Sequence, residues 1–177
     1  AMASHITGGS VFGYLNHDVG GPDGRRSHVE RQIDPAQAAI VRQIFELCAM
    51  GLGKVAITKR LKEEGALAPR AQQGRPHAWA PSSVREVLYR DLYRGEIIWN
   101  RTRKRDAWGV KRQRARPESE WLRVPAPALR IVPDTLWQAA HARLEAEFGE
   151  RTAWGQQLDA ELREARAAYA RLEAEFD

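Results

Sequence analysis

The chain has 177 residues, of which 43% are hydrophobic and 29% are charged, as in a soluble protein of one domain or one domain with an appendage. The single cysteine excludes an internal disulfide and a zinc site built from several cysteines, and no apolar run approaches the ~20 residues that span a bilayer. The net charge of +5 and the sequence pI of about 9.7 suit a partner that is negatively charged, such as nucleic acid or an anionic membrane surface. Nucleic acid is favoured, because the most basic stretch, residues 101–116, lacks the apolar helical face of a membrane-binding segment. We therefore expect a cytoplasmic protein with neither a cofactor nor a metal.

A β-hairpin is expected near the N-terminus. The Gly8-Gly9 pair and the short aromatic stretch after it suggest a flexible segment that leads into a strand or an anchor. Residues 20–24 (GGPDG) supply the backbone conformations of a turn, and His28–Ile33 would form the second strand. Two candidate DNA contacts leave this turn, Arg25 and Arg26.

Two helices are expected next. Asp34 and Pro35 provide an acidic N-cap and a proline at the first position of a helix that runs to about Met50. Its apolar stripe includes Cys48, which is expected to be a buried, inert thiol; a reactive thiol is the alternative. The second helix covers Lys54–Glu64. Two helices joined by a glycine-containing turn suit the first part of a helix-turn-helix, although other helical hairpins share this pattern.

A third helix is expected to begin at Pro81. Ser82 and Ser83 would cap it, with Glu86 in the spacing of a capping box. Its apolar side should face the core. The loop before the helix, residues 66–78, carries two further candidate phosphate contacts, Arg70 and Arg75.

The outward side of the third helix is a candidate recognition surface. A recognition helix places its N-terminal residues against base edges or phosphates in the major groove, and short hydroxyls beside an arginine meet that demand. We expect Arg85 to contact a guanine. The candidate DNA contacts of this helix are Ser82, Ser83, Arg85, Tyr89 and Arg90. The alternative is a solvated helix face with an ordinary cap.

A strongly basic segment, residues 101–116, lies beyond the third helix. It holds eight basic residues and one acid, so it carries +7 while the other residues sum to −2. Tyr93–Asn100 is β-branched and aromatic, so it is expected to be a strand that pairs with Trp121–Val124, with the basic loop as the wing of a winged helix. The candidate DNA contacts of the wing are Arg101, Arg103, Lys104, Arg105, Lys111, Arg112, Arg114 and Arg116. A loop that is merely charged and solvated is the alternative.

The C-terminal part is expected to be helical, with a first helix from Asp134 to Gly149. Apolar residues beyond it follow the four-and-three spacing of a heptad seam: Leu158, Leu162, Ala165, Tyr169, Leu172 and Phe176. Because fewer than three heptads are marginal alone, this segment would pack on the preceding helix or self-associate through residues 158–176. Residues 117–177 carry a net charge of −5, so this end is not expected to lie along DNA.

An ordered series of short motifs runs through the chain. In the first part it comprises Gly8-Gly9, Phe12-Gly13-Tyr14, Asp34-Pro35, Val41-Arg42, Ile44–Leu47, Gly51, Ile57 and Leu61. It continues with Trp79, Val84, Val87-Leu88, Tyr93-Arg94-Gly95, Trp99–Arg101, Ile131–Pro133 and Leu136-Trp137. In this series the chain resembles the large serine recombinases (the serine integrases and their transposon relatives) in their central recombinase DNA-binding domain, over about residues 5–144.

The resemblance implies a module that positions a recombinase on its DNA attachment site. In such recombinases a separate N-terminal domain carries the serine nucleophile, and the segment around Gly8-Gly9 would correspond to the linker that tracks the minor groove. The serines of this chain do not sit in the family's tyrosine-x-arginine-x-serine motif, and the cysteine-based zinc ribbon that commonly follows the domain has no counterpart. We therefore expect no catalysis by this chain itself. The catalytic domain would belong to a parent site-specific DNA recombinase, bacterial or phage-encoded.

The expected fold is α+β and mostly helical. It is a winged-helix-like helix-turn-helix domain with a small β-sheet or wing and a C-terminal helical extension that forms a short coiled coil. Residues 1–4 are assigned to a cloning remnant or linker, 5–148 to the DNA-binding domain and 149–177 to the heptad helix. The expected function is recognition of an attachment-site half in double-stranded DNA. The alternative is a protein-interaction module that works through the C-terminal helix.

Overall fold

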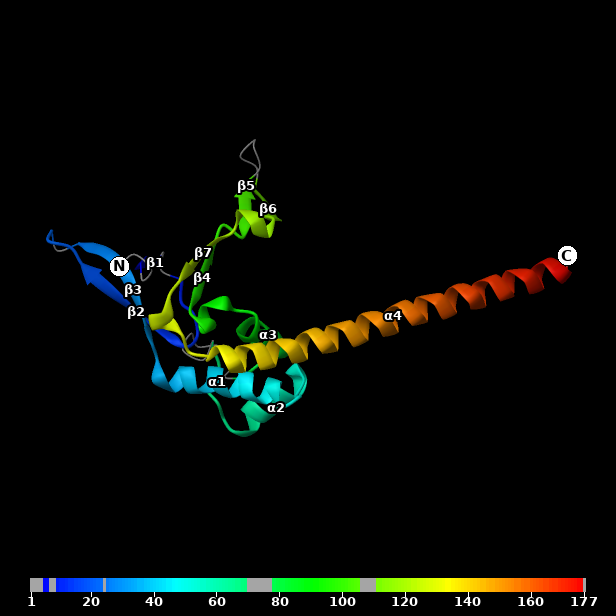
Figure 1. The fold of residues 1–177 in the computed structure, drawn as a ribbon, viewed down its shortest axis with the longest axis horizontal. Helices are drawn as coiled ribbons and strands as arrows, with labels where there is room; N and C mark the ends of the chain where they lie inside the picture. Colours follow the sequence, from blue (N-terminus) through cyan, green and yellow to red (C-terminus); the bar gives the residue numbers. More distant parts are fainter. Residues whose placement is uncertain (1–4, 7–8, 24, 70–77, 106–110, 177) are drawn as a thin grey trace. The chain divides into compact units, whose positions relative to one another are not determined.

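The structure is a computed structural model, and it describes residues 5–6, 9–23, 25–69, 78–105 and 111–176 (Figure 1). Helices dominate these residues and small antiparallel sheets accompany them, which confirms the mixed, mostly helical class. The chain divides into two compact units, Ala1–Ala140 and His141–Asp177. None of the helices in the described ranges has the length and hydropathy that crossing a bilayer requires.

The first unit begins with a small antiparallel sheet in the order β1-β3-β2. Strands β2 (Tyr14–Gly20) and β3 (Arg26–Ile33) form a hairpin, and β1 (His5–Ile6) pairs with the other edge of β3. The turn of the hairpin is closed by a 2.7 Å hydrogen bond from the Gly21 amide to the Arg25 carbonyl. The hairpin that the glycine-rich turn predicts is therefore confirmed.

Helix α1 (Pro35–Ala49) begins where the sequence indicates. The Asp34 carboxylate accepts hydrogen bonds from two backbone amides of the first turn, which would otherwise have no partner inside the helix. Cys48 is buried, as expected. Helix α2 (Lys54–Glu63) follows and is terminated near Gly65, whose φ of +66° lies in the left-handed region.

Helix α3 (Pro81–Leu88) packs against α1 and α2. Its inward side chains are buried as expected: Val84, Val87 and Leu88. The expected serine cap is wrong, because the N-cap is Ala80 and it makes no side-chain capping hydrogen bond. Since Pro81 already occupies the start of the helix, Ser82 and Ser83 lie inside the first turn and cannot act as the residue before it.

A strand pair follows α3. A short 3-10 helix, η2 (Asp91–Arg94), leads into strand β4 (Glu96–Trp99), which pairs antiparallel with β7 (Leu122–Pro125). The predicted pairing across the basic segment is therefore confirmed, but the predicted start of the first strand at Tyr93 is wrong, because Tyr93 lies in η2. Two further 3-10 helices flank β7, η3 (Glu118–Glu120) before it and η4 (Pro127–Leu129) after it.

The basic segment between β4 and β7 is a hairpin and not the simple loop that the sequence suggested. Strand β5 (Thr102–Arg105) pairs antiparallel with β6 (Lys111–Ala115), and Arg103 lies opposite Arg114. The hairpin extends beyond the ends of β4 and β7, away from α1, α2 and α3 (Figure 1). Extended backbone spaces the basic side chains along each strand, but Arg103 and Arg114 face each other across the ladder, where like charges repel.

Aromatic rings join distant segments in the core of the first unit. The rings of Phe45 in α1 and Trp137 stack with their centroids 5.2 Å apart. Phe12 meets Trp79 edge to face at 5.3 Å, and Trp79 is fully buried just before α3. The first contact joins α1 to the start of α4, and the second joins the N-terminal segment to the residues just before α3.

Helix α4 (Asp134–Phe176) is longer than expected. The predicted end at Gly149 is wrong, because the helix continues through both Gly149 and Gly155. A glycine inside a helix costs only about 1 kcal/mol relative to alanine, and the neighbouring alanine, glutamate, leucine and arginine residues favour helix. Trp137 near the start of the helix is buried, whereas Phe148 is 72% exposed.

Candidate nucleic-acid interface

The outward side of α3 carries the expected polar residues. Ser82, Arg85 and Tyr89 are exposed, whereas Ser83 and Arg90 are partly buried. The Arg85 guanidinium lies over the Tyr89 ring, 5.3 Å from its centroid. This contact holds an arginine and an aromatic ring side by side on the surface of the helix, where both are accessible to a partner.

Arg90 has a different environment from Arg85. It forms an ion pair with Glu86, one turn earlier in α3. The acid offsets part of the positive charge of this helix face, so α3 alone is not a strongly cationic surface. Any attraction for a polyanion must come from α3 together with its surroundings.

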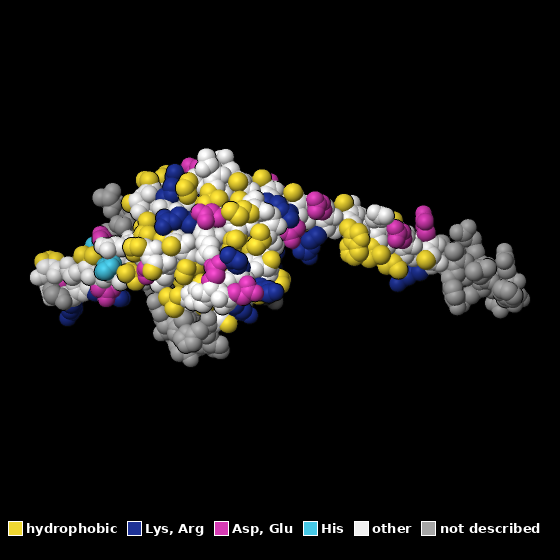
Figure 2. Space-filling view, turned by 90° about the horizontal axis from the view of Figure 1, so that it is seen from below, with side chains coloured by type: hydrophobic (Ala, Val, Ile, Leu, Met, Phe, Trp, Pro, Cys, Tyr) yellow, Lys and Arg dark blue, Asp and Glu magenta, His cyan; other side chains and the backbone are white. Residues whose placement is uncertain are grey.

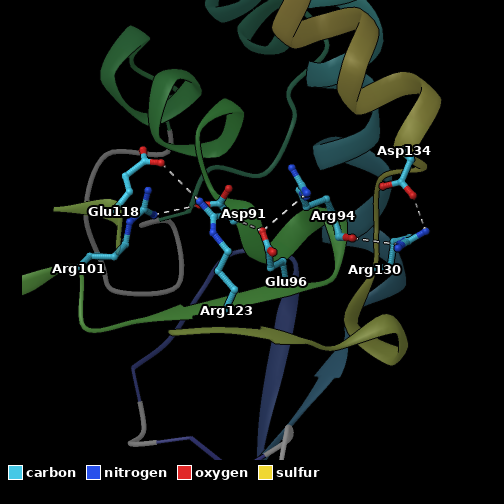
Figure 3. Close-up of polar contacts among 8 residues, drawn as sticks. All are labelled: Asp91, Arg94, Glu96, Arg101, Glu118, Arg123, Arg130 and Asp134. Atoms are coloured by element: carbon cyan, nitrogen blue, oxygen red, sulfur yellow. Dashed lines mark hydrogen bonds and ion pairs between the residues drawn. The ribbon is translucent and has the colours of Figure 1, made fainter. Parts of the chain in front are cut away.

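An ion pair, drawn in Figure 3, and a tryptophan ring hold the base of the β5–β6 hairpin to the body. The Arg101 Nη1 lies 3.0 Å from the Asp91 Oδ2 in η2. The guanidinium of Arg101 also lies 4.6 Å from the centroid of the Trp121 ring, and that of Arg123 lies 5.7 Å from the same centroid. Two arginines therefore stack on one indole, which restricts where the hairpin emerges.

Further ion pairs extend this network along β4 and β7. Arg123 in β7 approaches Glu96 in β4 at 3.0 Å and Glu118 in η3 at 3.9 Å. Arg94 lies 3.8 Å from Glu96, so one carboxylate serves two arginines. These ion pairs lie along the strand pair that carries the basic hairpin, and Figure 3 shows Arg94 and Arg123 both directed at Glu96.

Several predicted contacts lie on the hairpin itself. Arg103, Lys111 and Arg114 are exposed, and Arg116 pairs with Glu120 at 2.5 Å. The side chains of three other predicted contacts lie outside the described residues: Lys104, Arg105 and Arg112. The hairpin therefore presents basic side chains to solvent along both strands, while its two ends are fixed by ion pairs.

Two adjoining surface hollows connect α3 with the base of this hairpin. One, of about 230 Å³, is lined by Ser83, Glu86 and Arg90 together with residues of the N-terminal segment. The other, of about 480 Å³, is lined by Arg90 and Arg101 among others. Ser10, Val11 and Arg90 line both hollows. The structure thus brings the start of α3 and the base of the hairpin onto one continuous surface.

Two of the other predicted residues, Arg25 and Arg26, do not line either hollow. Arg25 and Arg26 are exposed near the turn of the β2–β3 hairpin, where Arg26 lies 3.4 Å from Asp18. Arg70 and Arg75 lie outside the described residues. On the face seen in Figure 2, basic and acidic side chains are interspersed, so positive charge is not gathered there.

Sequence reasoning missed Arg31 in β3. Its Nη2 donates a 2.8 Å hydrogen bond to the carbonyl of Gly9, and its guanidinium lies 5.7 Å from the centroid of the Tyr14 ring. Burial, more than any nearby charge, lowers the pKa of Arg31. The sequence could have indicated that Arg31 is partly buried. Alternate residues of a strand face the same side of the sheet, so Arg31 lies on the same face as Val29 and Ile33.

The comparisons with known proteins bear on the same region. The family model described as Recombinase matches residues 35–147, which is more than half of the chain. The match begins at the start of α1 and ends within α4, so it includes α3 and the basic hairpin. No curated protein matches the chain. Within the described residues, no cluster of histidine, cysteine and carboxylate side chains could hold a metal ion.

Proposed function

The chain belongs to the Recombinase family, and from this premise we propose that it is the double-stranded DNA-binding domain of a site-specific serine recombinase. The family supports a role in site-specific DNA recombination, with DNA as the partner. In the proposal, the domain recognises one half of an attachment site and positions a catalytic serine domain that belongs to the parent protein.

One observation carries this proposal: the shared surface of α3 and the hairpin base. Arg90 lines both hollows between the two, and Ser83 and Arg101 lie on either side of it. A helix and a basic hairpin on one surface can contact a duplex at the same time, one in a groove and the other on the backbone. In a winged helix, the recognition helix enters a groove and the wing contacts the backbone.

The proposed base contacts come from α3. Arg85 is exposed and stacks on Tyr89, so its guanidinium is partly ordered before it meets DNA. A guanidinium recognises the O6 and N7 atoms of guanine with two parallel hydrogen bonds. Because Arg85 is on the outward side of a helix of only eight residues, it can approach a base edge in the major groove.

The proposed backbone contacts come from the hairpin. Exposed Arg103 and Arg114 lie opposite each other in the β5–β6 ladder, and Lys111 begins β6. Cations at these places would neutralise phosphates without reading sequence. The pairing of Arg101 with Asp91 fixes the base of the hairpin, so the exposed cations beyond it would be held toward the duplex.

Selection of bound sequences from a random duplex pool tests the proposal directly. We expect the wild-type chain to enrich one motif, and Arg85→Ala to relax the preference at one base pair at a cost of about 1–3 kcal/mol. Arg60→Gln, which removes an equal charge from the outward side of α2, should leave the motif unchanged. An absence of binding to any duplex at low salt would refute the proposal.

A second candidate function is a protein-interaction module, and the surface of α4 favours it. Large apolar side chains are exposed on this helix: Phe148 (72%), Trp154 (67%), Leu158 (41%) and Leu162 (50%). Figure 2 shows hydrophobic side chains gathered along α4. Burying them would provide a driving force for self-association. A chain that associates through α4 but binds no duplex would favour this candidate over the first.

A further inference from the structure

Arg31 points to a binding role that the proposed function does not assign. Its guanidinium lines the larger hollow, of about 480 Å³, together with Gly9–Val11 of the N-terminal segment and Arg90. Of its five donor hydrogens, one is used in the hydrogen bond to the Gly9 carbonyl. The Nε atom is buried and has no hydrogen-bond partner in the described residues. Because this atom has almost no accessible surface, only the terminal nitrogens of the guanidinium can meet a group that enters the hollow.

The carboxylates that line the same hollow are already engaged. Asp91 pairs with Arg101 at 3.0 Å, and Glu96 pairs with Arg123 at 3.0 Å. Among the described residues, Arg31 pairs with no carboxylate. It is therefore a partly buried cation whose charge the surrounding described side chains do not balance.

The neighbouring groups increase this imbalance. Burial lowers the pKa of Arg31, and the positive charge of Arg90 lowers it further, so the two cations repel each other across the hollow. Tyr14 and Tyr93 lie beside them, but burial raises the pKa of both phenols, which therefore remain neutral at physiological pH. An anion is the group that would relieve both the desolvation of Arg31 and its repulsion from Arg90.

We propose that the hollow between β3, η2 and β4 binds one phosphate group, with Arg31 and Arg90 as its donors. The planar guanidinium group matches the geometry of phosphate oxygens. The site lies beside Gly9–Val11 and adjoins the hollow at the start of α3, so a duplex on the proposed surface would bring a backbone phosphate to it. A phosphate of the DNA backbone is the ligand only if the proposed function holds. Inorganic phosphate has the same chemistry and would bind whether or not the chain binds DNA.

The first arm of the test uses inorganic phosphate alone. Thermal unfolding of the whole chain is compared in sodium phosphate and in sodium chloride of equal ionic strength. We expect phosphate to raise the Tm of the wild type, because a ligand that binds only the folded state stabilises it. Arg31→Met should remove this rise and Arg31→Lys should reduce it, while Arg166→Gln, an exposed site on α4, should retain it.

The second arm measures duplex affinity as a function of salt. One lost phosphate contact lowers the slope of log affinity against log salt by ~0.9, so Arg31→Met should show this change and Arg166→Gln should not. The Tm in chloride shows whether Arg31→Met still folds; if it does not, Arg31→Lys keeps the charge and tests the lost donors in the first arm.

The outcomes separate the two proposals. A wild type that binds no duplex but gains an Arg31-dependent rise in Tm from phosphate would refute the proposed function and uphold the phosphate site. Duplex binding with an unchanged slope in both Arg31 variants, together with an unchanged response to phosphate, would overturn the site. A response to inorganic phosphate without a change in slope would overturn the DNA backbone as its source.

Discussion

The phenol rings of Tyr14 and Tyr93 stack in the core, with their centroids 5.9 Å apart and their planes 4° from parallel. The hydroxyl of Tyr14 donates to the Leu129 carbonyl at 2.7 Å, and that of Tyr93 donates to the Phe12 carbonyl at 2.8 Å. Each ring thus connects the N-terminal segment with the segments around β4 and β7. The pair also positions Arg31, which lies over the Tyr14 ring at the edge of the proposed phosphate site.

The tyrosine pair predicts a loss of stability at alkaline pH. Burial raises both phenol pKa values above the ordinary value of 10.0. As the pH rises through about 10, the unfolded chain releases protons that the folded chain keeps, so the free energy of unfolding falls. Each tyrosine should contribute about 0.7 kcal/mol per pH unit at pH 10, where the unfolded phenol is half ionised, and should approach about 1.4 kcal/mol per pH unit by pH 11. Urea unfolding at several values between about pH 8 and pH 11 measures the slope.

Two variants assign that slope to the buried pair. Tyr93→Phe should remove about half of the slope that the pair contributes, and it should cost about 1 kcal/mol at neutral pH because the Phe12 carbonyl loses its donor. Tyr89→Phe, at a side chain that is 45% exposed, should leave the slope unchanged. An equal effect of both variants would contradict the assignment.

Side chains lie so close to the backbone of Gly13 that a single added methyl group should lower the stability of the protein. Gly13 has a φ of +94°, and an added Cβ would lie 3.0 Å from the Cδ1 of Ile131 and 3.3 Å from the Tyr93 ring. Gly13→Ala should therefore lower the free energy of unfolding by about 1–3 kcal/mol. Denaturant unfolding measures this change. Gly9→Ala, where nothing lies within 4 Å of the added atom, is the matched control and should change stability by less than about 0.5 kcal/mol.

The ion pair at the hairpin base predicts different roles for two arginines of the basic segment. Arg114→Gln should weaken binding to all duplexes alike and lower the salt slope by ~0.9, with no change in stability. Arg101→Gln should leave the slope nearly unchanged, because its charge is already paired with Asp91, and should lower stability by less than about 1 kcal/mol. Filter binding at several salt concentrations, with urea unfolding of each variant, separates the two. The reverse pattern would show that Arg101 and not Arg114 meets the phosphate.

Local signals in the sequence predicted much of the fold. The glycine-rich turn fixed the β2–β3 hairpin, and Asp34 with Pro35 located the start of α1, because turns and caps depend on a few adjacent residues. The same kind of signal was misread at Ser82, where Pro81 had already begun the helix, and at Gly149, where a weak helix breaker lies in a strongly helical segment.

Most of the candidate site could not be predicted from short stretches of the sequence. Arg85 and the exposed hairpin arginines were predicted from composition and spacing, but their contact with DNA remains a prediction. The pairing of Arg101 with Asp91 joins residues of different elements, and the place of Arg31 depends on how β3 packs beside the segment after α3. Such contacts depend on tertiary packing, which periodicity in one strand does not specify.

The exposed apolar residues of α4 predict self-association that two substitutions should abolish. Leu158 and Leu162 are 41% and 50% exposed, and burying a leucine side chain contributes about 1.5–3 kcal/mol, so a second copy of the helix would gain from covering both. We expect sedimentation of the wild type to show a concentration-dependent dimer, and the double variant Leu158→Glu/Leu162→Glu to remain a monomer. Ala160→Glu, on the opposite side of the heptad, adds a charge without touching the seam and should dimerise normally. A wild type that stays monomeric at every concentration, or a control that dissociates as fully as the double variant, would show that this face of α4 does not bind a second copy.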